Sequence, residues 1–122
     1  MSKEEHDNRR ASKRIDARID VQFRTGTEFV NCYTQNLSKG GIYLETAELP
    51  DPNANIELVL DLNSAGDGSQ LGSVSLIGKV VRLMTVQMDG QKVHKVAIQF
   101  VDTPPHVQAK IDSLYNRLLD DQ

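Results

Sequence analysis

Apolar and polar residues alternate along short runs between positions 19 and 101, and this alternation predicts a β-rich fold. The first run sets Ile19, Val21 and Phe23 against polar neighbours. Successive side chains of a strand point to opposite faces, so a period of two gathers the apolar residues of a run on one face. Similar strand-like runs span residues 29–37, 42–46, 56–62, 73–87 and 93–101. We therefore expect about six antiparallel strands.

The connections between these runs predict how the strands pair. Asp89-Gly90 is the strongest hairpin signal, because both residue types tolerate the positive φ angles that a type I′ turn requires. In the long run before this turn, Val80 and Val81 break the alternation, which predicts a β-bulge or bend near Gly78. Short strands joined by hairpins, with glycine at the bends, favour a small closed barrel.

The hydrophobic period changes near the C-terminus, where we expect one α-helix over residues 104–119. Thr103 could cap this helix, and Pro104 suits the first helical position, where a missing N–H costs nothing. An amphipathic helix that follows a barrel is expected to cover an open end or side. Its apolar face would consist of Val107, Ile111, Leu114, Tyr115, Leu118 and Leu119.

Composition narrows the classes of function. A chain of 122 residues with 39% hydrophobic and 25% charged residues is typical of one globular domain. Its net charge of -3 does not favour DNA, RNA or acidic membranes as partners. No run reaches membrane-spanning length, and residues 1–10 lack the apolar core of a signal peptide. We therefore expect a cytoplasmic protein that does not insert into membranes.

Nothing in the sequence predicts an enzyme or a metal site. Cys32 is the only cysteine, which excludes an intrachain disulfide and a thiolate cluster and suits a reducing compartment. His6, His94 and His106 are scattered, with no partner at metal-ligand spacing. No nucleophile elbow, zinc-protease motif or phosphate-binding loop is present.

Two polar stretches predict a binding site for an anionic purine compound. Arg10 and Arg14 can lie along one side of a short segment, where each guanidinium can hold a phosphate or a guanine edge with two hydrogen bonds. Asn36 and Ser38 offer short hydrogen-bonding side chains, and Gly41 permits a sharp turn or a close approach to a ligand. The second stretch joins two predicted strands, which places it on a barrel rim.

The pattern Arg-x-x-x-Arg followed by Asn-x-Ser-x-x-Gly resembles the PilZ family of bacterial receptors for the second messenger cyclic di-GMP. The resemblance extends over residues 10–101 and implies a six- or seven-stranded antiparallel PilZ-like β-barrel with a C-terminal α-helix. We expect residues 12–122 to form this barrel domain and residues 1–11 to form a flexible N-terminal arm. The matched positions are Arg10, Arg14, Asn36, Ser38 and Gly41.

The resemblance also implies how the ligand is held. Cyclic di-GMP has two ionised phosphates and two guanines whose O6 and N7 atoms accept hydrogen bonds. Arg10 and Arg14 would clamp phosphates, contact guanine edges and stack on the purine. Asn36 and Ser38 would hydrogen-bond the guanine, and Gly41 would admit the base close to the backbone.

Arg9 bears on ligand stoichiometry and on signalling. In the PilZ family the residue before the first motif arginine influences whether one ligand or a stacked pair is held, and Arg9 occupies that position. We expect its guanidinium to favour an intercalated ligand dimer. Ligand binding would order the N-terminal arm over the barrel and so change an interaction with a downstream protein partner that the sequence does not identify.

Two other functions remain open. A PilZ-like scaffold would bind protein and no nucleotide, although the intact motif residues count against it. A small barrel that binds single-stranded nucleic acid would need stacking aromatic rings and positive charge. The chain has three Phe, three Tyr, no Trp and a net negative charge, which disfavours that function.

Overall fold

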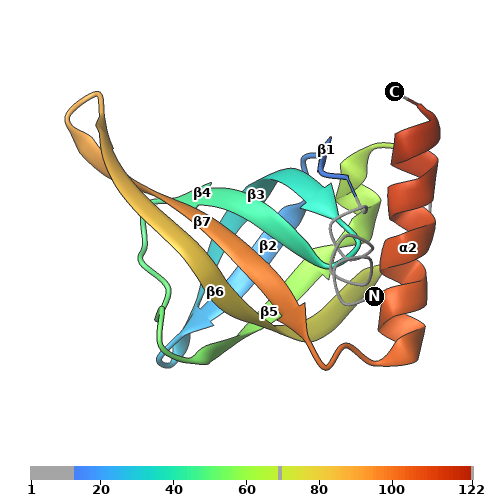
Figure 1. The fold of residues 1–122 in the computed structure, drawn as a ribbon, viewed down its shortest axis with the longest axis horizontal. Coiled ribbons are helices and arrows are strands. Elements are labelled where there is room, and N and C mark those ends of the chain that lie inside the picture. The colour runs from blue at the N-terminus through green and yellow to red at the C-terminus, as the bar shows by residue number, and fades with distance from the viewer. Residues whose placement is uncertain (1–12, 69, 122) are drawn as a thin grey trace, which may run out of the picture.

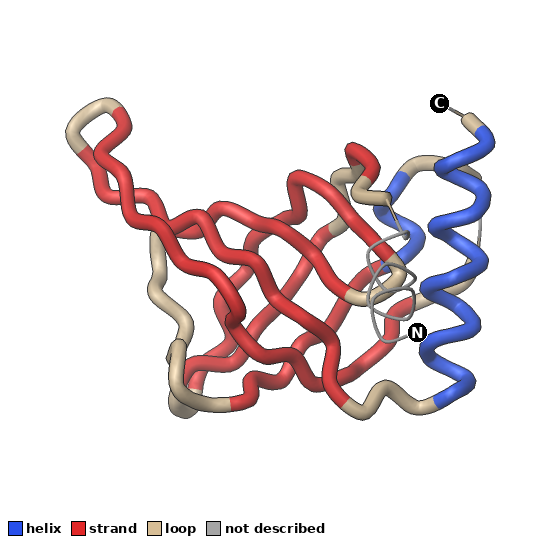
Figure 2. Tube along the Cα trace, in the orientation of Figure 1, coloured by secondary structure: helices blue, strands red, loops and turns tan. Residues whose placement is uncertain are grey.

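Seven β-strands, a short 3-10 helix and one α-helix make up the part of the protein described by the structure, a computed structural model covering residues 13–68 and 70–121 (Figure 1). The strands are antiparallel and account for most of the regular structure (Figure 2). The elements are β1 (Ile15–Asp16), β2 (Asp20–Thr25), β3 (Glu28–Ser38), β4 (Gly41–Thr46), β5 (Asn55–Asp61), η1 (Leu62–Ala65), β6 (Ser73–Met88), β7 (Gln91–Val101) and α2 (Pro105–Asp120).

Strand pairing closes the sheet into a barrel. The strand order is β1-β3-β2-β5-β6-β7-β4, and an additional pairing between β3 and β4 joins the two sides. Six strands therefore form the barrel, and the two-residue β1 adds to β3. The mainly β fold, the antiparallel barrel and the C-terminal helix are confirmed. Neither β1 nor η1 was expected, because two- and four-residue elements are too short to show a period.

The apolar phase of each strand fills the barrel. In β2, Val21 and Phe23 are buried between exposed polar neighbours, and β5 repeats the pattern with Leu58 and Leu60. Ile98 on β7 is also fully buried. Burying such side chains stabilises the fold by about 1.5–3 kcal/mol each. The alternation thus accounts for both the strands and the core.

Helix α2 stands across one end of the barrel (Figure 1), as an amphipathic C-terminal helix would. The helix starts one residue later than expected, because Pro104 precedes Pro105 and a residue before proline is disfavoured in the helical region. Pro104 is the N-cap, with φ -58° and ψ 143°, and no side chain caps the helix, so the expected role of Thr103 is wrong. The buried helix residues are Val107, Ile111, Leu114 and Tyr115.

The β6–β7 hairpin extends past the barrel (Figure 1). Asp89 and Gly90 have φ values of 53° and 81°, which confirms the expected turn with two positive φ angles. Strand β5 accompanies β6 only as far as Lys79, so beyond that residue β6 pairs with β7 alone among the described strands. The expected bulge is present, and the register shifts between Val80 and Arg82.

Candidate functional site

The segment that carries Arg14 pairs with the C-terminal part of β3. Ile15 pairs with Leu37, and the Ala17 amide donates to the Gln35 carbonyl at 3.3 Å. This attachment brings the first motif to the second, because Arg14 Nη1 donates to Asn36 Oδ1 at 2.9 Å. Asn36 and Arg14 therefore lie together at the rim of the barrel.

Helix α2 holds both halves of the site from one side. The hydroxyl of the buried Tyr115 donates to the Lys13 carbonyl at 2.6 Å, next to Arg14. About two turns earlier in the helix, Gln108 Nε2 donates to the Lys39 carbonyl at 2.9 Å, in the turn between β3 and β4. One rigid helix therefore fixes two backbone segments that are far apart in the sequence.

Ser38 ends β3 and Gly41 begins β4, on either side of the turn, and the structure gives each a bonding or packing role. Ser38 is 8% exposed and its Oγ donates to the Gly41 carbonyl at 3.3 Å. Gly41 pairs with Gln99 on β7, and a Cβ atom there would overlap the Ile98 carbonyl oxygen. The lack of a side chain at Gly41 thus allows β4 and β7 to approach. Contact of either residue with a ligand stays a prediction.

Arg9 and Arg10 were predicted to complete the site, and both lie outside the described residues. Of the predicted residues, the structure brings Arg14 and Asn36 into direct contact, with Ser38 two residues farther along β3.

The neighbourhood of Arg14 is a cavity on the outer face of four strands. Strand pairing sets Asn36 opposite Tyr43, Tyr43 opposite Ala97, and Ala97 opposite Arg82, in a row across β3, β4, β7 and β6. The cavity measures about 490 Å³, within the usual range for small-molecule sites. It is lined by Arg14, Asn36, Tyr43, Val81, Arg82, Met84, Lys95 and Ala97.

The charge of this cavity is positive. Arg14, Arg82 and Lys95 line it and none of the described lining residues is acidic, although Lys95 Nζ lies 3.8 Å from Glu45 Oε2. Burial lowers the pKa of Arg14, and the positive charge of Arg82 lowers that pKa further. Two guanidinium groups that repel each other in a partly desolvated site favour an anionic ligand.

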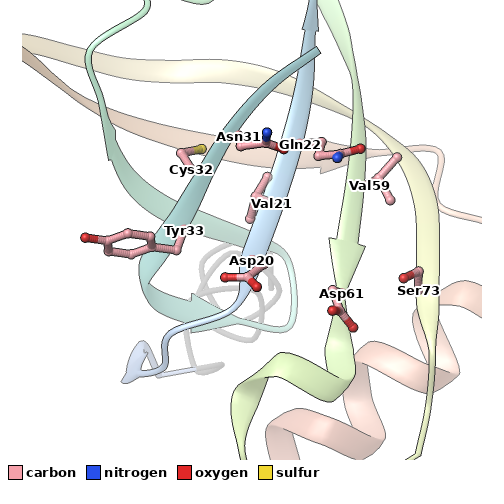
Figure 3. Close-up of a pocket in the computed structure, with 9 residues that line it drawn as sticks. All are labelled: Asp20, Val21, Gln22, Asn31, Cys32, Tyr33, Val59, Asp61 and Ser73. Carbon is pink, nitrogen blue, oxygen red and sulfur yellow. The ribbon is translucent and has the colours of Figure 1, made fainter.

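A larger cavity of about 610 Å³ lies elsewhere, on the outer face of β2, β3 and β5 (Figure 3). Asp20 and Asp61 line it, and they are directly paired across β2 and β5. Two adjacent carboxylates would repel a dianion, so this cavity does not suit the predicted ligand despite its size.

Sequence reasoning missed Tyr43, Arg82 and Lys95. Tyr43 and Lys95 occupy outward-facing positions of predicted strands, a signal that the alternation contains, whereas Arg82 reaches the outer face only through the bulge in β6. The alternation does not say which strands become neighbours. Closure of the barrel decides that β3, β4, β7 and β6 lie side by side.

The described residues offer neither a metal site nor a membrane-spanning helix. No group of three or more His, Cys, Asp or Glu side chains that could bind a metal occurs within residues 13–68 and 70–121. His94 Nδ1 instead lies 2.8 Å from Thr85 Oγ1. No helix in this part of the chain combines the length and apolar character needed to cross a membrane.

Comparison with known proteins gives one family and several structures of similar fold. The family model of the PilZ domain matches residues 8–117. No curated protein sequence matches the chain significantly.

Three solved structures illustrate the shared fold. Apo MrkH of K. pneumonia has a TM-score of 0.70 at 19% identity, covering 89% of this chain and 50% of MrkH. The PilZ domain of Escherichia coli YcgR with c-di-GMP has a TM-score of 0.69 at 14% identity, covering 89% of this chain and 90% of that one. Borreliella burgdorferi PlzA in complex with c-di-GMP has a TM-score of 0.65 at 15% identity, covering 99% and 58%.

These identities establish the fold and no more. The chain spans about half the length of MrkH, which is described as a c-di-GMP-dependent transcription regulatory factor.

Proposed function

The chain belongs to the PilZ domain family, and from this membership we propose that it is a receptor that binds cyclic di-GMP in the cavity beside Arg14. The observation that carries the proposal is the hydrogen bond between Arg14 and Asn36. It joins the two family motifs at the edge of a positively charged cavity. Solved structures of two PilZ-fold relatives, YcgR and PlzA, contain the same ligand.

Contacts of the backbone position the site, and the side chains of Arg14 and Asn36 would contact the ligand. Arg14 is positioned by β1 pairing and by Tyr115, so its guanidinium needs little ordering before it contacts a phosphate or a guanine edge. Asn36 has an amide N–H₂ group in addition to the oxygen that accepts from Arg14, and this group can donate to a guanine acceptor.

Calorimetric titration with cyclic di-GMP tests the proposal. Arg14→Ala should weaken binding by about ten- to a hundredfold, since hydrogen bonds to charged groups contribute about 1.5–3 kcal/mol. The matched control is Arg24→Ala, which removes an equally charged side chain that pairs with Glu57 away from the cavity. The control should bind as the wild type does. A wild-type protein that binds no cyclic di-GMP would overturn the proposal and favour the nucleotide-free scaffold.

Arg9 and Arg10, within residues 1–12, would add further contacts to the ligand. We propose that these two guanidinium groups close over the ligand, that Arg9 stacks on a second, intercalated ligand, and that the ordered arm changes contact with a protein partner in the bacterial cytoplasm. Titration should give two ligands per chain, and Arg9→Ala should reduce the ratio to one.

Removal of residues 1–12 retains Arg14 and should weaken binding by about tenfold or more. Unchanged affinity would contradict the role of the arm.

A further inference from the structure

Arg82 faces the cavity because of the bulge in β6. Val80 pairs with Ile98, whereas Arg82 pairs with Ala97, so Val81 has no partner across the ladder. Without the extra residue, Val81 would oppose Ala97, and Arg82 would oppose the fully buried Val96 and point into the barrel. The bulge therefore turns an arginine from the core side to the outer side, in the row of Tyr43 and Asn36.

Within residues 13–68 and 70–121, no ion pair neutralises the charge of Arg82. It makes no ion pair with any residue that the structure describes, and none of the described residues that line the cavity carries a carboxylate. Its charge acts on Arg14 across the cavity, as the lowered pKa of Arg14 reflects. Placing two like charges beside one cavity costs free energy unless an anion lies between them.

We propose that Arg82 is a further ligand-binding residue, which contacts a phosphate of the ligand from the β6 side of the cavity while Arg14 contacts the ligand from the β3 side. This inference rests on the proposed function. It assigns a ligand contact to a position outside both motifs, on the strand that leads into the extended hairpin. The anion removes the repulsion between the two arginines, so part of the affinity should depend on ionic strength.

The test is calorimetric titration of full-length variants with cyclic di-GMP at low and at high salt. Arg82→Ala should weaken binding by about tenfold or more at low salt, and the difference from wild type should shrink at high salt. Arg82→Lys keeps the charge but cannot make two parallel hydrogen bonds as a guanidinium can, so its affinity should lie between those of Arg82→Ala and wild type. The matched control is Lys92→Ala, which removes one positive charge from the same hairpin outside the cavity lining and should bind as wild type does.

Urea denaturation of the unliganded variants shows whether Arg82 acts on ligand binding or on the stability of the fold. Because Arg82 is exposed and its repulsion of Arg14 is lost, Arg82→Ala should be at least as resistant to urea as wild type. Wild-type affinity and salt dependence in Arg82→Ala, together with lost binding in Arg14→Ala, would overturn the role of Arg82 and leave the receptor function intact. Absence of binding by the wild type would instead overturn the receptor function itself.

Discussion

Gly41 is needed by the barrel, whatever it contributes to a ligand site. A Cβ atom at this position would overlap the backbone oxygen of Ile98, which belongs to a central strand and cannot move aside as a flexible side chain could. We expect Gly41→Ala to lower the free energy of unfolding by about 1 to 3 kcal/mol, as overpacking does in well-packed interiors. Urea denaturation measures this change.

Gly40 is the matched control for that substitution. It directly precedes Gly41, no heavy atom of the described residues lies within 4 Å of the place its Cβ would occupy, and its φ is not positive. Gly40→Ala should change stability by no more than about 0.5 kcal/mol. Equal losses in both variants would mean that the turn, and not the contact between β4 and β7, requires glycine.

Cys32 should react slowly in the folded protein. Burial raises the pKa of its thiol from 9.0 to about 11, so little of the reactive thiolate is present near pH 8. Alkylation by iodoacetamide at pH 8 should be at least about tenfold slower than in urea-unfolded protein. Similar rates in the two states would show that the thiol is accessible and that its pKa is not raised in the folded protein.

The same thiol gives stability a defined pH dependence. The unfolded thiol ionises near pH 9 and the folded one near pH 11, so the unfolded state releases its proton first as pH rises. Stability from the neutral thiol is therefore complete below about pH 9 and is lost as pH approaches 11. Cys32→Ala should remove this component of the pH dependence in urea unfolding.

At the scale of elements, α2 acts as a support for the site. Its residues Tyr115 and Gln108 bond to backbone carbonyls next to the two motifs, so the helix that covers the barrel end also fixes the position of Arg14. Such positioning lowers the free-energy cost of ordering on binding. The helix face that packs and the residues that position the site are thus parts of one element.

Tyr115→Phe tests this support. The variant keeps the ring that packs in the core and loses the hydroxyl bonded to Lys13. We expect a loss of about 1 kcal/mol in stability and a severalfold weaker affinity for cyclic di-GMP, although Tyr115 does not line the cavity. The control is Tyr33→Phe, because Tyr33 is 42% exposed. Wild-type affinity in Tyr115→Phe would contradict a positioning role.

At the scale of the whole molecule, the distribution of charge favours a small anionic ligand over a long polyanion. The net charge is -3, and the positive residues of the cavity are balanced elsewhere by Asp20, Asp61 and other carboxylates. A local positive cavity on an acidic protein attracts a compact anion more than it attracts a polyanion.

We therefore expect no binding of duplex DNA at physiological salt, with or without cyclic di-GMP. Fluorescence anisotropy of labelled duplexes measures this, and the protein should leave the anisotropy unchanged at micromolar concentration. MrkH, a transcription regulatory factor with the same fold, has a chain about twice as long. Tight salt-sensitive binding to duplexes by this chain would contradict the expectation.

The sequence was sufficient to predict the six barrel strands, the C-terminal helix and the family, because these depend on local periods and on motif residues close together in the chain. Val21, Phe23 and Leu58 lie where period two places them, and the turn at Asp89 and Gly90 follows from their backbone preferences. These features need no knowledge of which segments meet.

Only the tertiary structure decided how the site is composed. Arg14 contacts Asn36 because β1 pairs with β3, and Arg82 joins them because closure of the barrel sets β6, β7 and β4 side by side with β3. Gly41 is required by a strand that is distant in sequence. Each of these facts depends on contacts between residues far apart in the chain, and a local pattern carries no information about such contacts.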